Sequence, residues 1–222
     1  RTQELLYLIR IIKEKGLIKN HANFPVWVDS PLAVEATEIY DDKNLKRYFD
    51  ADTLELINNG INPIKFDNLK LAVTSDESRM INDDPTPKII LSASGMCEAG
   101  RIRHHLKHNL WREECTVLFV GYQAEGTLGR SIVNGADTVK LFGEEVKVRA
   151  HIEKMEGISG HADMNILLSW LDGFEHKPKK VFVNHGDDAV CDEFAQTITE
   201  RLNIVATAPY NGARYDLLTG EC

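Results

Sequence analysis

Cysteine is scarce in this chain of 222 residues, and its cysteines are widely spaced. The four positions are Cys97, Cys115, Cys191 and Cys222, and no two of them form a C-x-x-C pair. This spacing matches neither the disulfide framework of a small secreted domain nor a cysteine-rich zinc module. Because such a pattern is typical of a reducing compartment, we expect a cytoplasmic protein.

Short metal-binding motifs are missing too, since the chain contains no H-x-H and no H-E-x-x-H. A zinc site needs three or four ligands, so no complete site is predicted from local spacing. Three histidines do lie close together, at His104, His105 and His108. Without a carboxylate or a thiol in register, we expect this cluster to form a solvated surface.

Long apolar runs and an excess of positive charge are also absent. No apolar run approaches the roughly 18 residues of a transmembrane helix, so no membrane contact is expected. The net charge of -8 argues against a generic polyanion-binding surface, although it leaves room for a locally basic groove. The content of 43% hydrophobic and 27% charged residues is ordinary for a globular protein of one or two domains.

Apolar runs that suit strands alternate with amphipathic segments along the chain, which predicts an α/β fold with a mainly parallel sheet. Expected helices include Thr2–Lys15, Pro31–Tyr40 and Asp192–Leu202. Expected strands include Phe24–Val28, Lys88–Leu91, Cys115–Val120 and Ile204–Ala206, with short strands at 64–66 and 71–73. Val139–Phe142 and Val146–Ile152 are predicted to form a hairpin with Glu144 and Glu145 as its turn. The chain opens inside a helix, so its true beginning is expected upstream.

Polar residues follow two of the predicted strands in the first half of the chain. Asp29 ends one strand, and Ser30 with Pro31 suits the start of a helix, with Ser30 as cap. The strand Lys88–Leu91 runs into Ser92–Met96, a small-residue loop that precedes another helix. Such a loop can be an anion cradle at a helix N-terminus, or it can simply let the strand turn tightly, and both interpretations stay open.

The stretch from Ile158 to Asp187 carries the clearest functional candidates. His161 precedes a predicted helix, Met164–Phe174, and His185 follows a buried strand, Val181–Val183, at the point where functional side chains often sit. The helix presents one apolar face, which we expect to pack on the sheet and to bring both histidines to one rim: Ile166, Leu167, Trp170 and Leu171.

An Asp follows each histidine by two residues, at Asp163 and Asp187. We expect each carboxylate to hydrogen-bond to its histidine and so to fix the tautomer of that ring. A histidine before glycine at a strand end is equally often a turn residue, so the alternative for His185 is purely structural.

Six short segments, in this order, resemble the β-CASP branch of the metallo-β-lactamase superfamily, a group of nucleases. They are Arg1–Leu6, Asp29–Ala33, Ser92–Met96, Gly121–Leu128, Ser159–Asp163 and Asn184–Asp187. The resemblance implies a β-CASP domain at 1–157, inserted into a metallo-β-lactamase domain whose C-terminal segment is 158–222. It further implies a two-zinc enzyme that cuts RNA.

The resemblance also implies roles for individual residues. His161 falls on the histidine thought to protonate the leaving group, and His185 on a zinc ligand. Ser94 and Gly95 fall in the loop that faces the substrate backbone, and we group Ser159 with them as substrate-binding. The H-x-H-x-D-H segment of the family is missing, so the chain alone is expected to bind no zinc and to be inactive.

The leading hypothesis is therefore that the chain is part of a zinc-dependent ribonuclease, with RNA as its partner. Single-stranded DNA as the substrate, a homodimer, and endonucleolytic or exonucleolytic cleavage all remain open. The alternative is a non-catalytic nucleic-acid-binding or dimerisation module of a processing complex. A hydrolase of a small phosphate or acyl substrate is a third hypothesis, which the large insertion disfavours.

Overall fold

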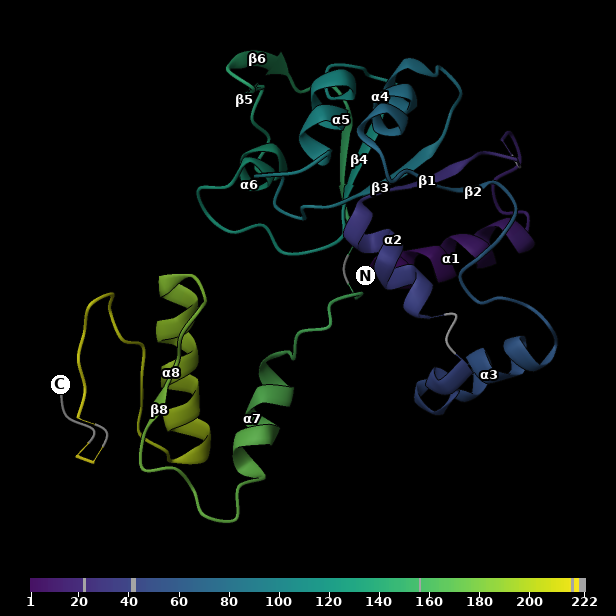
Figure 1. Ribbon diagram of the computed structural model, residues 1–222. Helices are drawn as coiled ribbons and strands as arrows, with labels where there is room; N and C mark the ends of the chain where they lie inside the picture. The colour runs from purple at the N-terminus through teal and green to yellow at the C-terminus, as the bar shows by residue number, and fades with distance from the viewer. Residues whose placement is uncertain (22, 41–42, 156, 217, 220–222) are drawn as a thin grey trace. The chain divides into compact units, whose positions relative to one another are not determined.

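The computed structural model describes the chain except residues 22, 41–42, 156, 217 and 220–222 (Figure 1). The chain forms two compact units, Arg1–Ser159 and Gly160–Cys222. Helices alternate with short, mainly parallel strands, which confirms the predicted α/β fold class. The assignment of 1–157 and 158–222 to two family domains stays a prediction. Within the described residues, no helix is both long and apolar enough to cross a membrane.

A three-stranded parallel sheet organises the first part of unit 1. β1 (Val26–Asp29) lies between β2 (Leu69–Leu71) and β3 (Ile89–Ser92), and Asp29 pairs in register with Ser92. Figure 1 shows helices on both faces of this sheet. One face carries α1 (Thr2–Glu14) and α2 (Pro31–Ile39), and the other carries α4 (Ser75–Asp83) and α5 (Ile102–Asn109).

The core on the α1 and α2 side is buried from solvent: Leu6, Val26 and Val28 are 0% exposed. Ser30 caps α2 by accepting a hydrogen bond from the amide of Ala33, and Pro31 stands at the first helical position. Both features confirm the predicted start of this helix. They also fix the direction in which the chain leaves Asp29 at the end of β1.

The connection between α2 and β2 contains η1 (Lys43–Tyr48) and α3 (Ala51–Asn58). The strand predicted at 64–66 is wrong, because the side chain of Asn62 accepts hydrogen bonds from the amides of Ile64 and Lys65 and holds a turn there. The strand predicted at 71–73 lies earlier, at β2.

The second part of unit 1 pairs β4 (Thr116–Phe119) in parallel with β7 (His151–Lys154). α6 (Leu128–Val133) and an antiparallel hairpin of β5 (Thr138–Leu141) and β6 (Glu144–Lys147) pack around a shared core with α5. The predicted turn at Glu144 and Glu145 is wrong, since both residues pair within the hairpin. Phe142 and Gly143 form the turn, with φ of +53° and +83°, a conformation that glycine adopts freely.

Unit 2 contains α7 (Met164–Asp172), β8 (Val181–Phe182), α8 (Asp188–Leu202) and β9 (Ala206–Thr207), with β8 and β9 parallel. Its core is Leu168, Leu171, Ile198 and Ile204. The predicted inward face of α7 is partly wrong: Leu171 is buried, but Ile166 is 57% exposed and Trp170 is 62% exposed. The described contacts bury Leu168 instead of Leu167, because α7 packs on α8 along that neighbouring stripe.

Candidate functional site

The loop between β3 and α5 holds two of the predicted substrate-binding residues, Ser94 and Gly95. Ser94 is half-buried and Gly95 is exposed, and a Cβ added at Gly95 would meet no protein atom within 4 Å. The loop closes on itself, since the amide of Cys97 donates to the Ser94 carbonyl and the amide of Ile102 donates to the Ala93 carbonyl. Gly95 therefore presents bare backbone to the outside on a well-tied loop.

A second loop, between β4 and α6, braces the first from the side. The buried amide Nε2 of Gln123 donates to the Gly95 carbonyl at 2.9 Å, and the amide of Gly129 donates to the Met96 carbonyl at 3.0 Å. A Cβ at Gly129 would lie 1.8 Å from Gln123 Oε1 and 3.1 Å from the Met96 carbonyl oxygen, so a larger residue there would displace the bracing side chain of Gln123. The glycine-rich segment 121–129 thus serves close backbone packing against the Ser94–Gly95 loop.

Beneath this loop lies a buried polar network centred on Asp29, which is 0% exposed. Its Oδ2 accepts a hydrogen bond from Ser78 Oγ at 2.6 Å and lies 2.6 Å from His105 Nε2. Its Oδ1 accepts one from the Arg101 guanidinium at 2.7 Å. The carboxylate thereby joins the end of β1 to α4 and to the start of α5.

The partners of Asp29 are themselves tied down. Arg101 also donates to the Ala72 carbonyl at 3.0 Å and to the Val73 carbonyl at 2.6 Å, just after β2. His105 Nδ1 lies 2.9 Å from Asn82 Oδ1. The hydroxyl of Ser92, at the start of the loop, donates to the backbone carbonyl of Asp29 at 3.1 Å. The network therefore reaches from all three strands of the sheet to the Ser94–Gly95 loop.

Ser78, His105 and Asp29 do not form a catalytic triad. In a triad the serine bonds to the histidine, whereas here both side chains meet the same carboxylate oxygen. Ser78 is 7% exposed and His105 is 5% exposed, so a substrate could not reach either. The geometry supports a structural role for these residues.

In unit 2, Asp163 caps α7 by accepting a hydrogen bond from the amide of Ile166 at 2.9 Å. His161 lies in the loop before this helix and is exposed, as is Ser159 at the end of unit 1. The cap accounts for Asp163 structurally, and its role beside His161 stays a prediction.

His185 lies in the turn between β8 and α8 and is also exposed. Its φ of +66° is unusual for a residue with a side chain, and its amide donates to Asn184 Oδ1 at 2.8 Å. Directly after it, a Cβ at Gly186 would lie 2.9 Å from Cys191 Sγ, so a larger residue there would have to displace the Cys191 side chain. Asp187 is the N-cap residue of α8.

Both predicted functional histidines precede helices of unit 2, since α7 starts at Met164 and α8 at Asp188. Figure 1 shows these two helices running in the same direction, with both N-terminal ends at the same end of the unit. Neither His161 nor His185 is turned into an apolar interior. Their joint action in one cleft stays a prediction.

Comparison with known proteins identifies the family. Residues 2–132, more than half of the chain, match the family model of the Beta-Casp domain. The chain belongs to the Beta-Casp family. Residues 145–209 match a second model, the Zn-dependent metallo-hydrolase RNA specificity domain. The resemblance inferred from the six motifs is confirmed.

Relatives of this Beta-Casp chain include proteins with RNA-related names. It is 37% identical over 188 residues to Ribonuclease TTHA0252 of Thermus thermophilus, covering 85% of this chain and 41% of that protein. It is 32% identical over 212 residues to an RNase J-like protein of Methanocaldococcus jannaschii, covering 96% and 47%. It is 30% identical over 217 residues to the transcription termination factor FttA of Methanosarcina mazei, covering 95% and 33%. The chain thus spans less than half the length of these relatives.

The family description implies a metal, but the residues present do not make a metal site by themselves. Within the part of the chain that the structure describes, no group of three or more His, Cys, Asp or Glu side chains is arranged to hold an ion. A single imidazole such as His185 is too few for a zinc centre.

The Asp29 network is what sequence reasoning missed in this Beta-Casp chain. The expectation of a solvated surface for the histidine cluster is wrong for His105, while His104 and His108 are exposed. The sequence does contain a signal that His105 is buried. Its helix has one inward face at helical spacing, made of Ile102, His105, Leu106 and Asn109. Asp29 itself was noted at a strand end, but its partners come from residues 49 to 76 positions away.

The Asp29 carboxyl has a lowered pKa. Burial is the largest influence and acts to raise it, but hydrogen bonds from His105, Ser78 and Arg101, together with the charge of His105, outweigh burial and hold the pKa below its ordinary value. A carboxyl whose pKa is lower when folded stabilises the fold above its unfolded pKa of about 3.9. This stabilisation is lost as the pH falls through the folded value.

Asp29→Asn should lower the free energy of unfolding at pH 7 by about 3–5 kcal/mol, because it leaves Arg101 and His105 facing a neutral group. The difference from wild type should begin to shrink as the pH falls below about 4, where Asp29 of the unfolded chain takes up a proton, and should vanish only below the lower pKa of the folded state. Denaturant unfolding from pH 7 to pH 3 measures both effects. As the matched control, Asp76→Asn breaks only an exposed pair with Arg79 and should change stability by less than about 1 kcal/mol. Equal effects of the two substitutions would contradict the assignment.

Proposed function

We propose that this chain is part of a zinc-dependent ribonuclease that hydrolyses phosphodiester bonds of RNA in the cytoplasm. The observation that carries the proposal is the 37% identity over 188 residues to a protein named as a ribonuclease. The match of residues 145–209 to an RNA specificity domain of metallo-hydrolases supports the same substrate. The exposed, braced backbone at Gly95 offers a surface that a sugar-phosphate chain can approach closely.

In the proposed reaction, water adds to phosphorus and the departing ribose oxygen takes up a proton. We assign that proton to His161, because its imidazole is exposed and histidine is the side chain most often used as a general acid. Ser94, Gly95 and Ser159 bind the substrate backbone in this proposal. Asp163 orients His161.

We assign His185 as one ligand of a two-zinc centre, with Asp187 orienting its ring. The centre would activate the attacking water. The remaining ligands would come from protein beyond these 222 residues.

A second candidate is a non-catalytic RNA-binding or dimerisation module of a processing complex. One observation favours it: several relatives are named as transcription termination factors. The cleavage assay that follows separates the two candidates.

His161→Ala in the full-length protein should reduce the rate of RNA cleavage by about 10²–10⁴-fold while RNA affinity stays near that of wild type, since only the proton donor is lost. Cleavage of end-labelled RNA, with single-stranded DNA of the same sequence in parallel and with or without chelator, measures this effect. His176→Ala, an exposed histidine of the same unit, is the matched control and should cut normally. Chelator-insensitive cleavage would refute the zinc dependence, and no cleavage by wild type would refute the enzyme and leave the binding module.

His185→Ala in the full-length protein should lower the zinc content, because one ligand is removed, and His176→Ala should not. The isolated 222-residue chain should hold no stoichiometric zinc and should not cut RNA. Elemental analysis after gel filtration measures zinc in all four samples, including wild type. Stoichiometric zinc in the isolated chain would contradict the shared site.

A further inference from the structure

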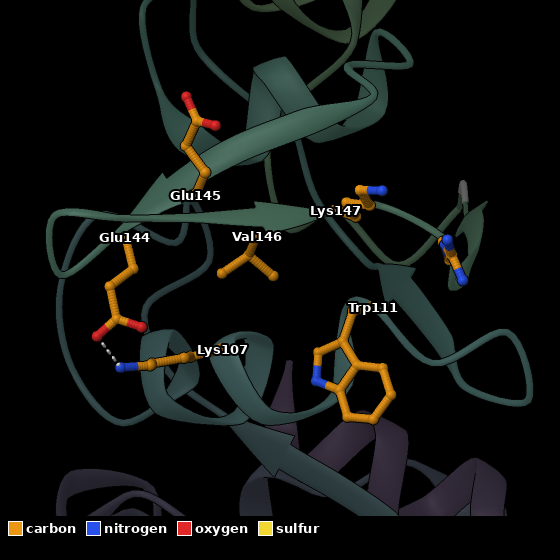
Figure 2. Close-up of a pocket in the computed structure, with 7 residues that line it drawn as sticks. Lys107, Trp111, Glu144, Glu145, Val146 and Lys147 are labelled. Carbon is orange, nitrogen blue, oxygen red and sulfur yellow. Dashed lines mark hydrogen bonds and ion pairs between the residues drawn. The ribbon is translucent and has the colours of Figure 1, made fainter.

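A groove of about 460 Å³ lies between the C-terminal end of α5 and the β5–β6 hairpin of unit 1. Figure 2 shows the ion pair of Lys107 and Glu144 that spans this groove, with 2.6 Å between Nζ and Oε1. Arg149, which also lines it, lies 3.6 Å from the carboxylate of Glu113. Because these cations already have acidic partners, the groove offers a polyanion such as RNA no net attraction.

A different cation, Arg1, lies against the loop that follows β4. A Cβ added at Gly121 would lie 3.0 Å from Arg1 Cζ and closer still to Arg1 Nη1. The guanidinium therefore occupies the space that a side chain at position 121 would fill. A larger residue at this position would displace the side chain of Arg1.

One buried side chain joins Gly121 to the Ser94–Gly95 loop. Gln123 is 5% exposed, and its Nε2 donates to the Gly95 carbonyl at 2.9 Å and to the Gly121 carbonyl at 3.1 Å. Both carbonyl oxygens thus lie within hydrogen-bond distance of a single nitrogen atom. The guanidinium of Arg1 and the bare backbone of Gly95 are neighbours on either side of this shared contact.

The position of these residues in the fold is one where ligands bind. The Ser94–Gly95 loop follows β3 and Gly121 follows β4, each at the carboxyl end of a parallel strand, and open α/β sheets bind ligands beyond such ends. The first turn of α1, which carries Arg1, is fixed to α2. Gln3 Nε2 donates to Thr37 Oγ1 at 3.0 Å.

Arg1 is exposed and makes no ion pair with any residue that the structure describes, Glu4 in the next turn included. The acidic residues of the two loops have other partners. Glu98 accepts a hydrogen bond from the amide of Leu128, and Glu125 lies 3.8 Å from Arg130. A guanidinium left without a carboxylate is suited to a phosphate, because its planar fork donates two parallel hydrogen bonds.

We propose that Arg1 is a substrate-binding residue whose guanidinium, seated on Gly121, holds one backbone phosphate of the RNA strand that passes over Gly95. This inference rests on the proposed function and adds to it a contact that responds to charge and not to base sequence. Gly121 is the residue that positions Arg1 for this contact.

Arg1→Gln in the full-length protein should raise the Kd for labelled single-stranded RNA about three- to tenfold, because one charge-assisted contact is lost. It should also reduce the log–log salt slope by about 0.7, the contribution of one phosphate. Both changes should be the same for oligo(A) and oligo(U). Lys15→Gln, which removes the same charge from the other end of α1, is the matched control and should bind as wild type does. Fluorescence anisotropy at several salt concentrations measures these effects.

Gly121→Ala is a second variant that tests the same contact without touching the charge. The added methyl group should displace Arg1 and so raise the Kd. Combined with Arg1→Gln it should cause little further loss, since Gly121 acts through Arg1. Additive losses in the double variant would contradict the positioning role of Gly121.

Cleavage separates failure of this contact from failure of the proposed function. Where wild type cuts RNA, Arg1→Gln should raise KM and leave kcat near that of wild type, because Arg1 holds the strand before and during the reaction. If wild type binds RNA without cutting it and Arg1→Gln still raises the Kd, the nuclease proposal fails and the contact stands. If wild type binds no RNA, both proposals fail.

Unchanged RNA binding overturns the Arg1 proposal by itself. This is the case if Arg1→Gln is folded and matches wild type in Kd and in salt slope. The same conclusion holds if the variant differs from wild type only by a lower free energy of unfolding, which would show that Arg1 pairs with a carboxylate elsewhere in the full-length protein.

Discussion

A buried carboxylate, that of Asp29, holds the first part of this chain together. It ends the central strand β1 with no exposure to water, and three side chains from α4 and α5 satisfy its two oxygens. Burying a charge away from water is unfavourable unless an opposite charge and hydrogen bonds compensate for the lost hydration. The Asp29 carboxylate has both kinds of partner. Arg101, which binds this carboxylate, also donates hydrogen bonds to the carbonyls of residues 72 and 73. The same carboxylate therefore fixes how β1, β2 and α5 meet.

This network holds the loop that leads into α5 in place. Ser92 bonds to the backbone of Asp29, and Arg101 clamps the far end of the loop, so Ser94 and Gly95 are held between two anchored points. Gln123 braces the same loop from the side. A pre-formed loop loses less conformational entropy when it binds a ligand, which suits the RNA-binding role proposed for it.

Local patterns predicted much of the fold. The α/β class, the Ser30–Pro31 helix start and α8 all follow from apolar spacing and caps, which act over a few residues. The prediction of a turn at Glu144 and Glu145 was wrong, because the turn needs a positive φ and Gly143 supplies it. The buried role of His105 was missed because its partners Asp29 and Asn82 are far away in sequence. Their positions beside a predicted helix and strand marked His161 and His185 as candidates, but only the family's motifs gave them roles, because an incomplete ligand set cannot be recognised from spacing.

The central claim is that the braced backbone at Gly95 faces RNA. Gly95→Ala tests it most directly, because the added methyl group would meet no protein atom within 4 Å and the backbone there does not require glycine. The account predicts an unchanged or slightly higher free energy of unfolding, by up to about 1 kcal/mol, together with weaker RNA binding by the full-length protein. Undiminished RNA affinity in a variant of normal stability would contradict it.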